Sequence, residues 1–297
     1  MITNLLIATL LVASPDTVLV SAQWLQRHLS DPDLVVLQVG FDRIAYDEGH
    51  IPGARFAPLD RFHNHTVADR LPDPQSMAAA LGAVGVSNRS RVIISGDPLG
   101  ASILFVALEY LGMGDRTAVL DGGAAAWVAS GGELSRKPVT ITPATFTPKL
   151  REDLVVDAAA VQRRLGQRGV TLLDGRSRAE YEGTARESLP RRGHLPGARH
   201  LDWLDTFDPR DVGSANGRRG DNPPQAARLR PVAELERLFA GAGADRAGEV
   251  VTYCTVGMRA SHLYFVARLL GYPVRIYVGS MADWTTQPSR PVVAGAK

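Results

Sequence analysis

Hydrophobic positions along this chain fall in short runs that alternate with amphipathic stretches. Six runs have the length and composition of buried strands: Leu34–Val39, Arg91–Ser95, Thr117–Leu120, Val170–Asp174, Val250–Tyr253 and Arg275–Val278. Three stretches of the second half have helical spacing: Val155–Gly166, Pro231–Ala240 and Ala260–Leu270. Strands that alternate with helices predict an α/β fold, a mainly parallel sheet flanked by helices.

The pattern occurs twice. Gly-His-Ile-Pro-Gly-Ala-Arg at 49–55 recurs as Gly-His-Leu-Pro-Gly-Ala-Arg at 193–199, and Asp121-Gly122-Gly123 with Trp127 is echoed by Val278-Gly279-Ser280 with Trp284. We therefore predict two tandem domains, at residues 18–136 and 151–297. Residues 137–150, rich in Thr and Pro and without a helical period, are expected to form an extended linker.

Residues 1–17 are expected to form a leader ahead of the first domain. The apolar run Leu5–Ala13 is too short to span a bilayer and resembles the hydrophobic part of a signal peptide, but no Lys or Arg precedes it. If residues 1–14 act as a signal peptide, the protein is exported or periplasmic. If they form a loosely packed segment, it is cytoplasmic.

Composition excludes several function classes. Hydrophobic residues make up 45% and charged residues 22% of the chain, and the net charge of +2 is too mild to indicate a nucleic-acid partner. No stretch predicts a membrane span, and no phosphate-cradling glycine motif is present. His63 and His65 lack an evident third ligand, so we expect neither a metal nor a cofactor. Tandem domains can supply each other's interface, so we expect a monomer.

The single cysteine, Cys254, lies where a strand turns into a helix. Backbone N–H groups at a helix start are unpaired, and here they can curl around the sulfur. The helix dipole and Arg259 both favour the thiolate, and Gly257 permits close backbone approach. The predicted anion-binding residues of this loop are Thr255, Val256, Gly257, Met258 and Arg259.

The first copy serves as an internal comparison. Six residues, Cys254 to Arg259, precede the pair Ala260-Ser261, whereas only four, Asp97 to Gly100, precede the matching pair Ala101-Ser102, and Asp97 stands at the place of the cysteine. A short loop with a carboxylate cannot stabilise another anion. The first domain is therefore predicted to be non-catalytic.

These features resemble the tandem-domain rhodanese family of sulfurtransferases. The resemblance rests on the paired Gly-His-Ile/Leu-Pro-Gly-Ala segments, on Asp121-Gly122-Gly123 with Trp127, and on Tyr253-Cys254-x-x-Gly257-x-Arg259. It implies two rhodanese-like folds, a catalytic second domain, an active site near the domain interface and a persulfide on Cys254. It also implies a small-molecule sulfur donor and a thiophilic acceptor, cyanide or a thiol.

The donor is predicted from charge. In the mercaptopyruvate-using branch of the family an arginine holds the substrate carboxylate, and Glu180 falls where that arginine would be expected. A carboxylate there would repel a keto acid, and the cationic end of the loop at Arg259 resembles thiosulfate-type members. Thiosulfate is therefore the predicted donor. The alternatives are 3-mercaptopyruvate and a sulfur carrier without turnover. A cysteine phosphatase is disfavoured because its loop has five residues between Cys and Arg, and this loop has four.

Other residues have weaker signals. Arg192 is the second candidate for anion binding, unless Arg191 takes that place and Arg192 is a solvated surface residue. Arg176 is expected to pair with a nearby carboxylate, and His50 and His194, present in both copies, to be structural. Phe41 is either an aromatic residue lent to the cleft or a core residue. The segment 205–224 is predicted to be a surface loop, a lid or an insertion.

Overall fold

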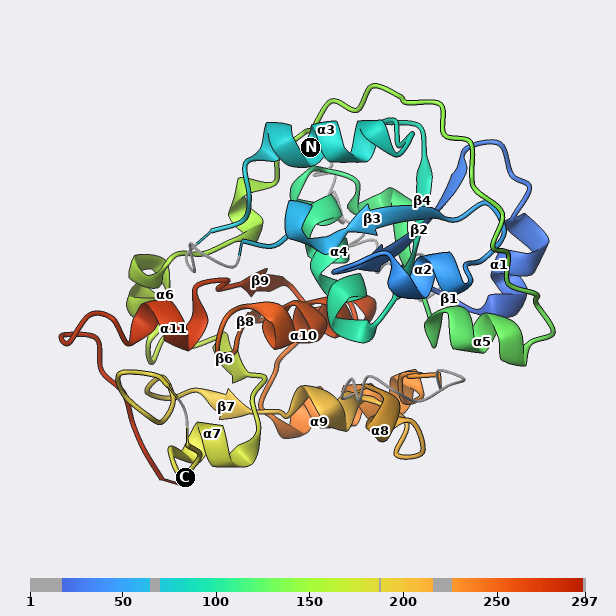
Figure 1. Cartoon of the computed structure of the whole chain (residues 1–297). Coiled ribbons are helices and arrows are strands. Elements are labelled where there is room, and N and C mark those ends of the chain that lie inside the picture. The colour runs from blue at the N-terminus through green and yellow to red at the C-terminus, as the bar shows by residue number, and fades with distance from the viewer. Residues whose placement is uncertain (1–17, 65–69, 187, 216–225, 296–297) are drawn as a thin grey trace, which may run out of the picture.

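The first half of the chain forms one parallel sheet with helices on both faces (Figure 1). The computed structural model describes residues 18–64, 70–186, 188–215 and 226–295, so the predicted leader lies outside the described residues. In sheet order the strands are β1 (Leu19–Val20), β5 (Thr117–Leu120), β4 (Arg91–Gly96), β2 (Leu34–Gly40) and β3 (Arg55–Pro58). The helices are α1 (Ala22–His28), α2 (Ile44–Glu48), α3 (Pro74–Ala83), α4 (Pro98–Tyr110) and α5 (Gly123–Ala129).

The second half repeats this arrangement with four parallel strands. Their order is β7 (Arg199–His200), β6 (Val170–Asp174), β8 (Glu249–Tyr253) and β9 (Val274–Ile276). The helices are α6 (Ala158–Arg164), α7 (Arg178–Glu182), α8 (Val212–Ala215), α9 (Val232–Gly241), α10 (Met258–Leu269) and α11 (Ser280–Trp284). The prediction of tandem α/β units is confirmed.

Three predicted elements have boundaries that are wrong by two residues or more, among them α10, which begins at Met258 and not at Ala260. Helix α6 begins at Ala158 and not at Val155, because the Asp157 side chain caps it by accepting from Ala160 N at 2.7 Å. Val155 instead forms a parallel bridge with Ile276. Strand β9 ends at Ile276, two residues before the predicted end.

The two domains share a core built around α4 and α10. These helices run parallel, because successive contacts join Ser102 to His262, Phe105 to Phe265 and Glu109 to Arg268. One hydrophobic cluster includes residues of both sheets and of both helices. As a consequence, the strand-to-helix turns of the two copies lie at the same end of this helix pair.

His262 introduces a pH-sensitive group into this interface. It is 2% exposed and lies between the hydroxyl oxygens of Ser102, at 3.2 Å, and Thr206, at 2.8 Å. Burial lowers the pKa of His262 to about 3, below its ordinary value. Below about pH 6.5, His262 is therefore protonated in the unfolded chain but stays neutral in the folded chain.

Because only the unfolded chain binds this proton, we expect the free energy of unfolding to decrease by about 1.4 kcal/mol for each pH unit as the pH is lowered from 6 to 4. Urea unfolding at several pH values measures this dependence, with His262→Gln as the comparison. In the variant, the free energy of unfolding should depend less steeply on pH, by the contribution of one proton. Equal slopes for the two proteins would contradict the assignment.

The predicted linker, residues 137–150, contains neither helix nor strand and runs along the first domain (Figure 1). Backbone hydrogen bonds hold it there, from Ala144 N to Gly82 O and from Lys149 N to Leu111 O, both at 2.9 Å. Of the predicted loop 205–224, the part up to residue 215 includes α8, and the rest lies outside the described residues. None of the helices described has the length and apolar composition that crossing a membrane requires.

Candidate active site

Cys254 lies directly after β8, at the start of the turn into α10, as predicted. Its side chain is 1% exposed, and Gly257 N donates a hydrogen bond to Sγ at 3.1 Å. Gly257 has φ +89°, and a Cβ there would approach Val278 O to 2.9 Å. Only glycine fits this position without strain, and the loop depends on it to fold back over the sulfur.

The carbonyl groups of this loop face α11. Met281 N donates to Cys254 O at 3.0 Å, and Ala282 N donates to Thr255 O at 2.9 Å. With the carbonyls fixed in this way, the remaining N–H groups are available to an anion. In the described part of the chain, no acceptor is found for the backbone N–H groups of Thr255, Val256, Met258 and Arg259.

Ser280 holds the first residue of the loop. Its Oγ accepts from Cys254 N at 3.0 Å and donates to Tyr277 O at 2.9 Å, whereas Sγ lies 4.0 Å away. Among the described residues it is the one non-glycine with positive φ, +52°, and its counterpart in the first copy, Gly123, has φ +56°. A serine in this conformation costs about 1–3 kcal/mol. The sequence repeat contained this residue, but its role was not predicted.

We expect Ser280→Ala and Ser280→Gly to separate strain from positioning. Both remove the hydrogen bond to Cys254 N, but only glycine adopts the positive φ of this position without strain. The alanine variant should therefore be less stable than the glycine variant by about 1–2 kcal/mol. Thermal unfolding measures this difference. In both variants Cys254 should react with a small thiol reagent about fivefold more slowly, because one hydrogen bond of about 1 kcal/mol no longer orders the loop. A glycine variant whose cysteine reacts at the unchanged rate would show that the hydroxyl has no positioning role.

Arg259 forms a bidentate ion pair with Glu180 of α7. Nη1 donates to Oε2 and Nη2 donates to Oε1, each at 2.7 Å, and Nη2 also donates to Thr255 Oγ1 at 2.7 Å. Burial opposes ionisation of Glu180, but hydrogen bonds from Arg259 and Ser177 hold the pKa of its carboxyl well below the usual range. Burial likewise opposes the charge of Arg259, and the bond to Glu180 raises its pKa above the ordinary value.

This pair changes the electrostatic argument made from the sequence. The sequence alone predicts that Arg259 is a cation for a substrate and that Glu180 is a charge that repels one. The structure joins the two groups, and each largely neutralises the other. The anion-binding capacity of the loop therefore comes mainly from its backbone N–H groups and the start of α10.

The other predicted residues are also placed. Arg176 pairs with Asp174, both fully buried, and donates to Gly193 O at 2.7 Å, which confirms a structural role. Arg191 donates to backbone carbonyls near the end of the chain, among them Gln287 O at 2.7 Å, while Arg192 is exposed. Within the described residues no hydrogen bond or ion pair joins Arg192 to the cysteine loop, and its role stays a prediction.

The two repeated histidines are structural in the same way. His50 stacks on Tyr46 with ring centroids 4.1 Å apart, and His194 stacks on Tyr181 at 3.7 Å. Each tyrosine hydroxyl donates to the alanine carbonyl of its own repeat segment. These matching contacts fix the alignment of the two copies around the site.

The first copy lacks the loop altogether. Pro98, Leu99 and Gly100 already belong to α4, and Asp97 caps this helix by accepting from the N–H groups of Leu99 and Gly100. In the first copy the N–H groups at the helix start thus donate to the Asp97 carboxylate, at the position where the second copy has the sulfur of Cys254. Phe41 is 48% exposed, so its prediction as a core residue is wrong.

Comparisons with known proteins agree with this architecture. A family model described as rhodanese-like domain matches residues 21–130 and again 157–287. The chain is 36% identical to a probable 3-mercaptopyruvate sulfurtransferase of Pseudomonas aeruginosa, covering 93% of this chain and 98% of that protein. It is 31% identical to a thiosulfate sulfurtransferase of Corynebacterium glutamicum, covering 95% and 92%.

Two further similarities cover nearly the whole chain. A sulfur carrier protein of Thermus thermophilus is 30% identical over 94% of this chain and 97% of its own length. Among solved structures, the anaerobic ergothioneine biosynthesis enzyme of Chlorobium limicola aligns with a TM-score of 0.80 and 25% identity, covering 96% of this chain and 72% of the enzyme.

Proposed function

The chain belongs to the rhodanese-like family, and we propose that it transfers sulfur from thiosulfate to a thiophilic acceptor through a persulfide on Cys254. The names of its relatives support sulfur transfer at the level of the family, since they include two sulfurtransferases and a sulfur carrier. They differ in the donor, so the choice of thiosulfate rests on the site.

The proposed reaction is a double displacement. The Cys254 thiolate attacks the outer sulfur of thiosulfate, the S–S bond of the donor breaks, and its electron pair leaves with sulfite. The terminal sulfur of the resulting persulfide carries a negative charge. Cyanide or a thiolate then attacks that sulfur, takes it away and returns the cysteine as thiolate.

The observation that carries this proposal is the set of N–H groups around Sγ. Gly257 N already donates to the sulfur at 3.1 Å, and four neighbouring N–H groups of the loop have no acceptor among the described residues. Fixed donors of this kind stabilise charge that develops in a reaction because they need no reorganisation. They suit an anionic persulfide and the small anion that forms it.

The arginines of the site favour thiosulfate over a keto acid. A carboxylate is best held by the planar fork of an unoccupied guanidinium. Arg259 already binds Glu180 through both terminal nitrogens, and Arg176 is fully buried against Asp174. The identity to the relative from Pseudomonas aeruginosa keeps 3-mercaptopyruvate as the second candidate donor.

A steady-state assay of thiocyanate formation tests the proposal, with thiosulfate or 3-mercaptopyruvate as donor and cyanide as acceptor. We expect thiosulfate to give the larger kcat/KM. A larger value with 3-mercaptopyruvate would select the second donor. A stable persulfide with neither donor turned over would identify a carrier and overturn the proposal.

The ion pair gives a sharper version of this assay. Glu180→Gln should release Arg259 for a substrate carboxylate and raise kcat/KM for 3-mercaptopyruvate, relative to thiosulfate, by on the order of tenfold, the value of one charge-assisted hydrogen bond. Glu182→Gln is the matched control on the same helix, because Glu182 forms its ion pair with Arg178, at 3.9 Å, and forms none with Arg259. An unchanged donor ratio in Glu180→Gln would disconnect the ion pair from donor choice.

A further inference from the structure

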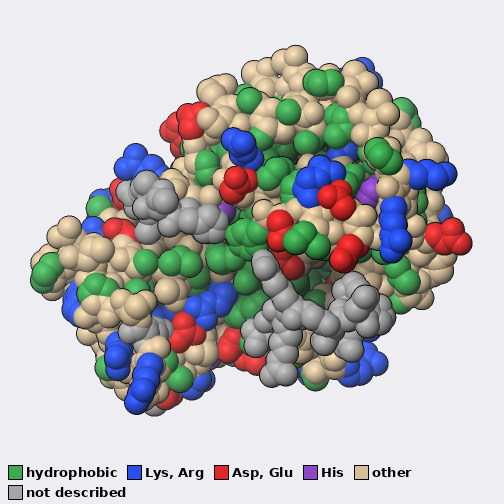
Figure 2. Space-filling model, in the orientation of Figure 1, with side chains coloured by type: hydrophobic (Ala, Val, Ile, Leu, Met, Phe, Trp, Pro, Cys, Tyr) green, Lys and Arg blue, Asp and Glu red, His purple; other side chains and the backbone are tan. Residues whose placement is uncertain are grey.

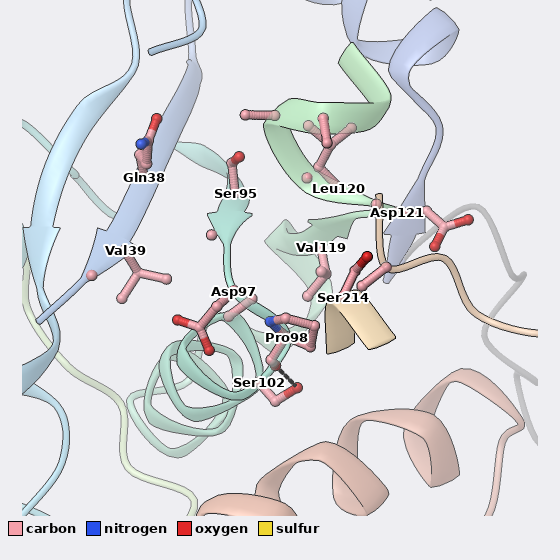
Figure 3. A pocket seen from close by; sticks show the side chains of 18 of the residues that line it. Gln38, Val39, Ser95, Asp97, Pro98, Ser102, Val119, Leu120, Asp121 and Ser214 are labelled. Carbon is pink, nitrogen blue, oxygen red and sulfur yellow. Dashed lines mark hydrogen bonds between the residues drawn. The ribbon is translucent and has the colours of Figure 1, made fainter. Parts of the chain in front are cut away.

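A cavity of about 630 Å³ opens at the carboxyl ends of the strands of the first sheet, away from the cysteine loop (Figure 3). Gln38 and Ser95, on β2 and β4, lie on one side of it, and Asp121 at the end of β5 lies on another. Phe207, His262 and Phe265 of the second domain also line it, but none of residues 254–259 does. Its size is that of a small-molecule site.

At two positions beside the cavity the first copy has uncharged residues where the second copy has carboxylates. Counting back equally from the matched Tyr46 and Tyr181, Val39 corresponds to Asp174 and Ala45 to Glu180. In the second copy these carboxylates hold Arg176 and Arg259. In the first copy, Val39 and Ala45 line open space.

Two buried polar atoms of the cavity wall have no partner. Gln38 and Ser95 are paired in register on neighbouring strands and are 9% and 1% exposed. Neither Gln38 Oε1 nor Ser95 Oγ makes a hydrogen bond within the described residues. A buried oxygen of this kind is costly unless something donates to it, and a ligand in the cavity can do so.

The charge of the wall restricts the ligand. Four carboxylates line the cavity, Asp42, Glu48, Asp97 and Asp121, and no Lys or Arg is among its described lining residues. Burial raises the pKa of Asp121 to about 6, although Leu229 N donates to its Oδ1 at 3.0 Å and the charge of Arg228 opposes the shift. Figure 2 shows acidic side chains beside exposed hydrophobic ones near the centre of the visible face. Such a wall disfavours the anionic sulfur donor.

We propose that this cavity is a second ligand site, which takes a small organic molecule with an apolar body and a protonated amine. The amine donates to Gln38 Oε1 and Ser95 Oγ, the carboxylates of the wall favour its positive charge, and the body packs on apolar residues such as Val119, Leu120 and Pro98. This site goes beyond the proposed function, because neither the persulfide nor either sulfur donor uses it.

Ligand-observed NMR with the full chain tests the proposal with three probes that share one ring: phenethylamine, 2-phenylethanol and 3-phenylpropionate. We expect phenethylamine to bind most tightly and the acid least. Gln38→Leu and Ser95→Ala should each weaken phenethylamine about tenfold, because a buried acceptor of a charged donor is lost. Cys254→Ser should leave its affinity unchanged.

Two controls keep a folding defect apart from loss of the site. Gln38→Leu removes an unpartnered buried amide oxygen, so its melting temperature should not fall, and Gln167→Leu on an exposed loop should bind phenethylamine like the parent. Ala45→Trp at the exposed rim should block binding without loss of stability. The proposal is overturned if phenethylamine does not bind, if the acid binds equally well, or if Gln38→Leu and Ala45→Trp both bind it unchanged.

Discussion

Replacing Cys254 by serine is expected to lower sulfur transfer from either donor by at least about a thousandfold, because a hydroxyl has neither the nucleophilicity nor the ionisation of a thiol. The loss should appear in kcat. The change is nearly isosteric, so the loop, held by Ser280 and α11, should keep its structure and the melting temperature should shift little.

Mass spectrometry makes this prediction specific to the persulfide. After incubation with thiosulfate the parent protein should gain the mass of one sulfur atom, and cyanide should remove it. The serine variant should gain nothing. Turnover by Cys254→Ser well above the uncatalysed rate, or a sulfur adduct on that variant, would falsify the assignment of the nucleophile.

Arg268→Met is expected to have the largest effect on stability. The Glu109 carboxylate is fully buried in α4 and accepts from Arg268 of α10, with Nη2 at 2.8 Å, and from Tyr264 Oη at 2.5 Å. Removing the guanidinium leaves an uncompensated charge between the domains. Breaking a buried pair in this way costs about 3–5 kcal/mol.

Chemical unfolding measures this loss, and two comparisons isolate its cause. The double variant Glu109→Leu with Arg268→Met removes both charges and should recover most of the stability. Arg89→Met breaks an exposed pair with Asp33 and should change the free energy of unfolding by less than about 1 kcal/mol. A small effect of Arg268→Met alone would mean that the carboxylate finds water or another partner at the interface.

Much of the fold could be predicted because its signals are local. The hydrophobic runs give the central strands, the repeated Gly-His segment gives the duplication, and the run Glu249–Tyr253 before Cys254 places the sulfur at a strand end. The helix boundaries were less accurate, since side-chain caps such as those of Asp97 and Asp157 decide where a helix begins.

The details of the site depend on contacts between distant residues. Arg259 and Glu180 are 79 positions apart, and their pairing is set by where α7 packs beside the loop. The left-handed conformation of Ser280 is invisible in sequence because serine rarely adopts it. The cavity of the first copy is lined by residues from several strands and from both domains, and a sequence pattern does not show that they enclose a space.

The single cysteine of the chain also has a consequence for oxidative damage. A thiolate exposed to peroxide proceeds to sulfenic acid and, without a second thiol to trap it, to irreversible higher oxides. The 297 residues contain no other cysteine to serve as that trap. Because the proposed reaction requires thiosulfate to reach Sγ, the 1% exposure of Cys254 does not exclude the smaller peroxide, and a sulfenic acid formed there would have no thiol of this sequence to trap it.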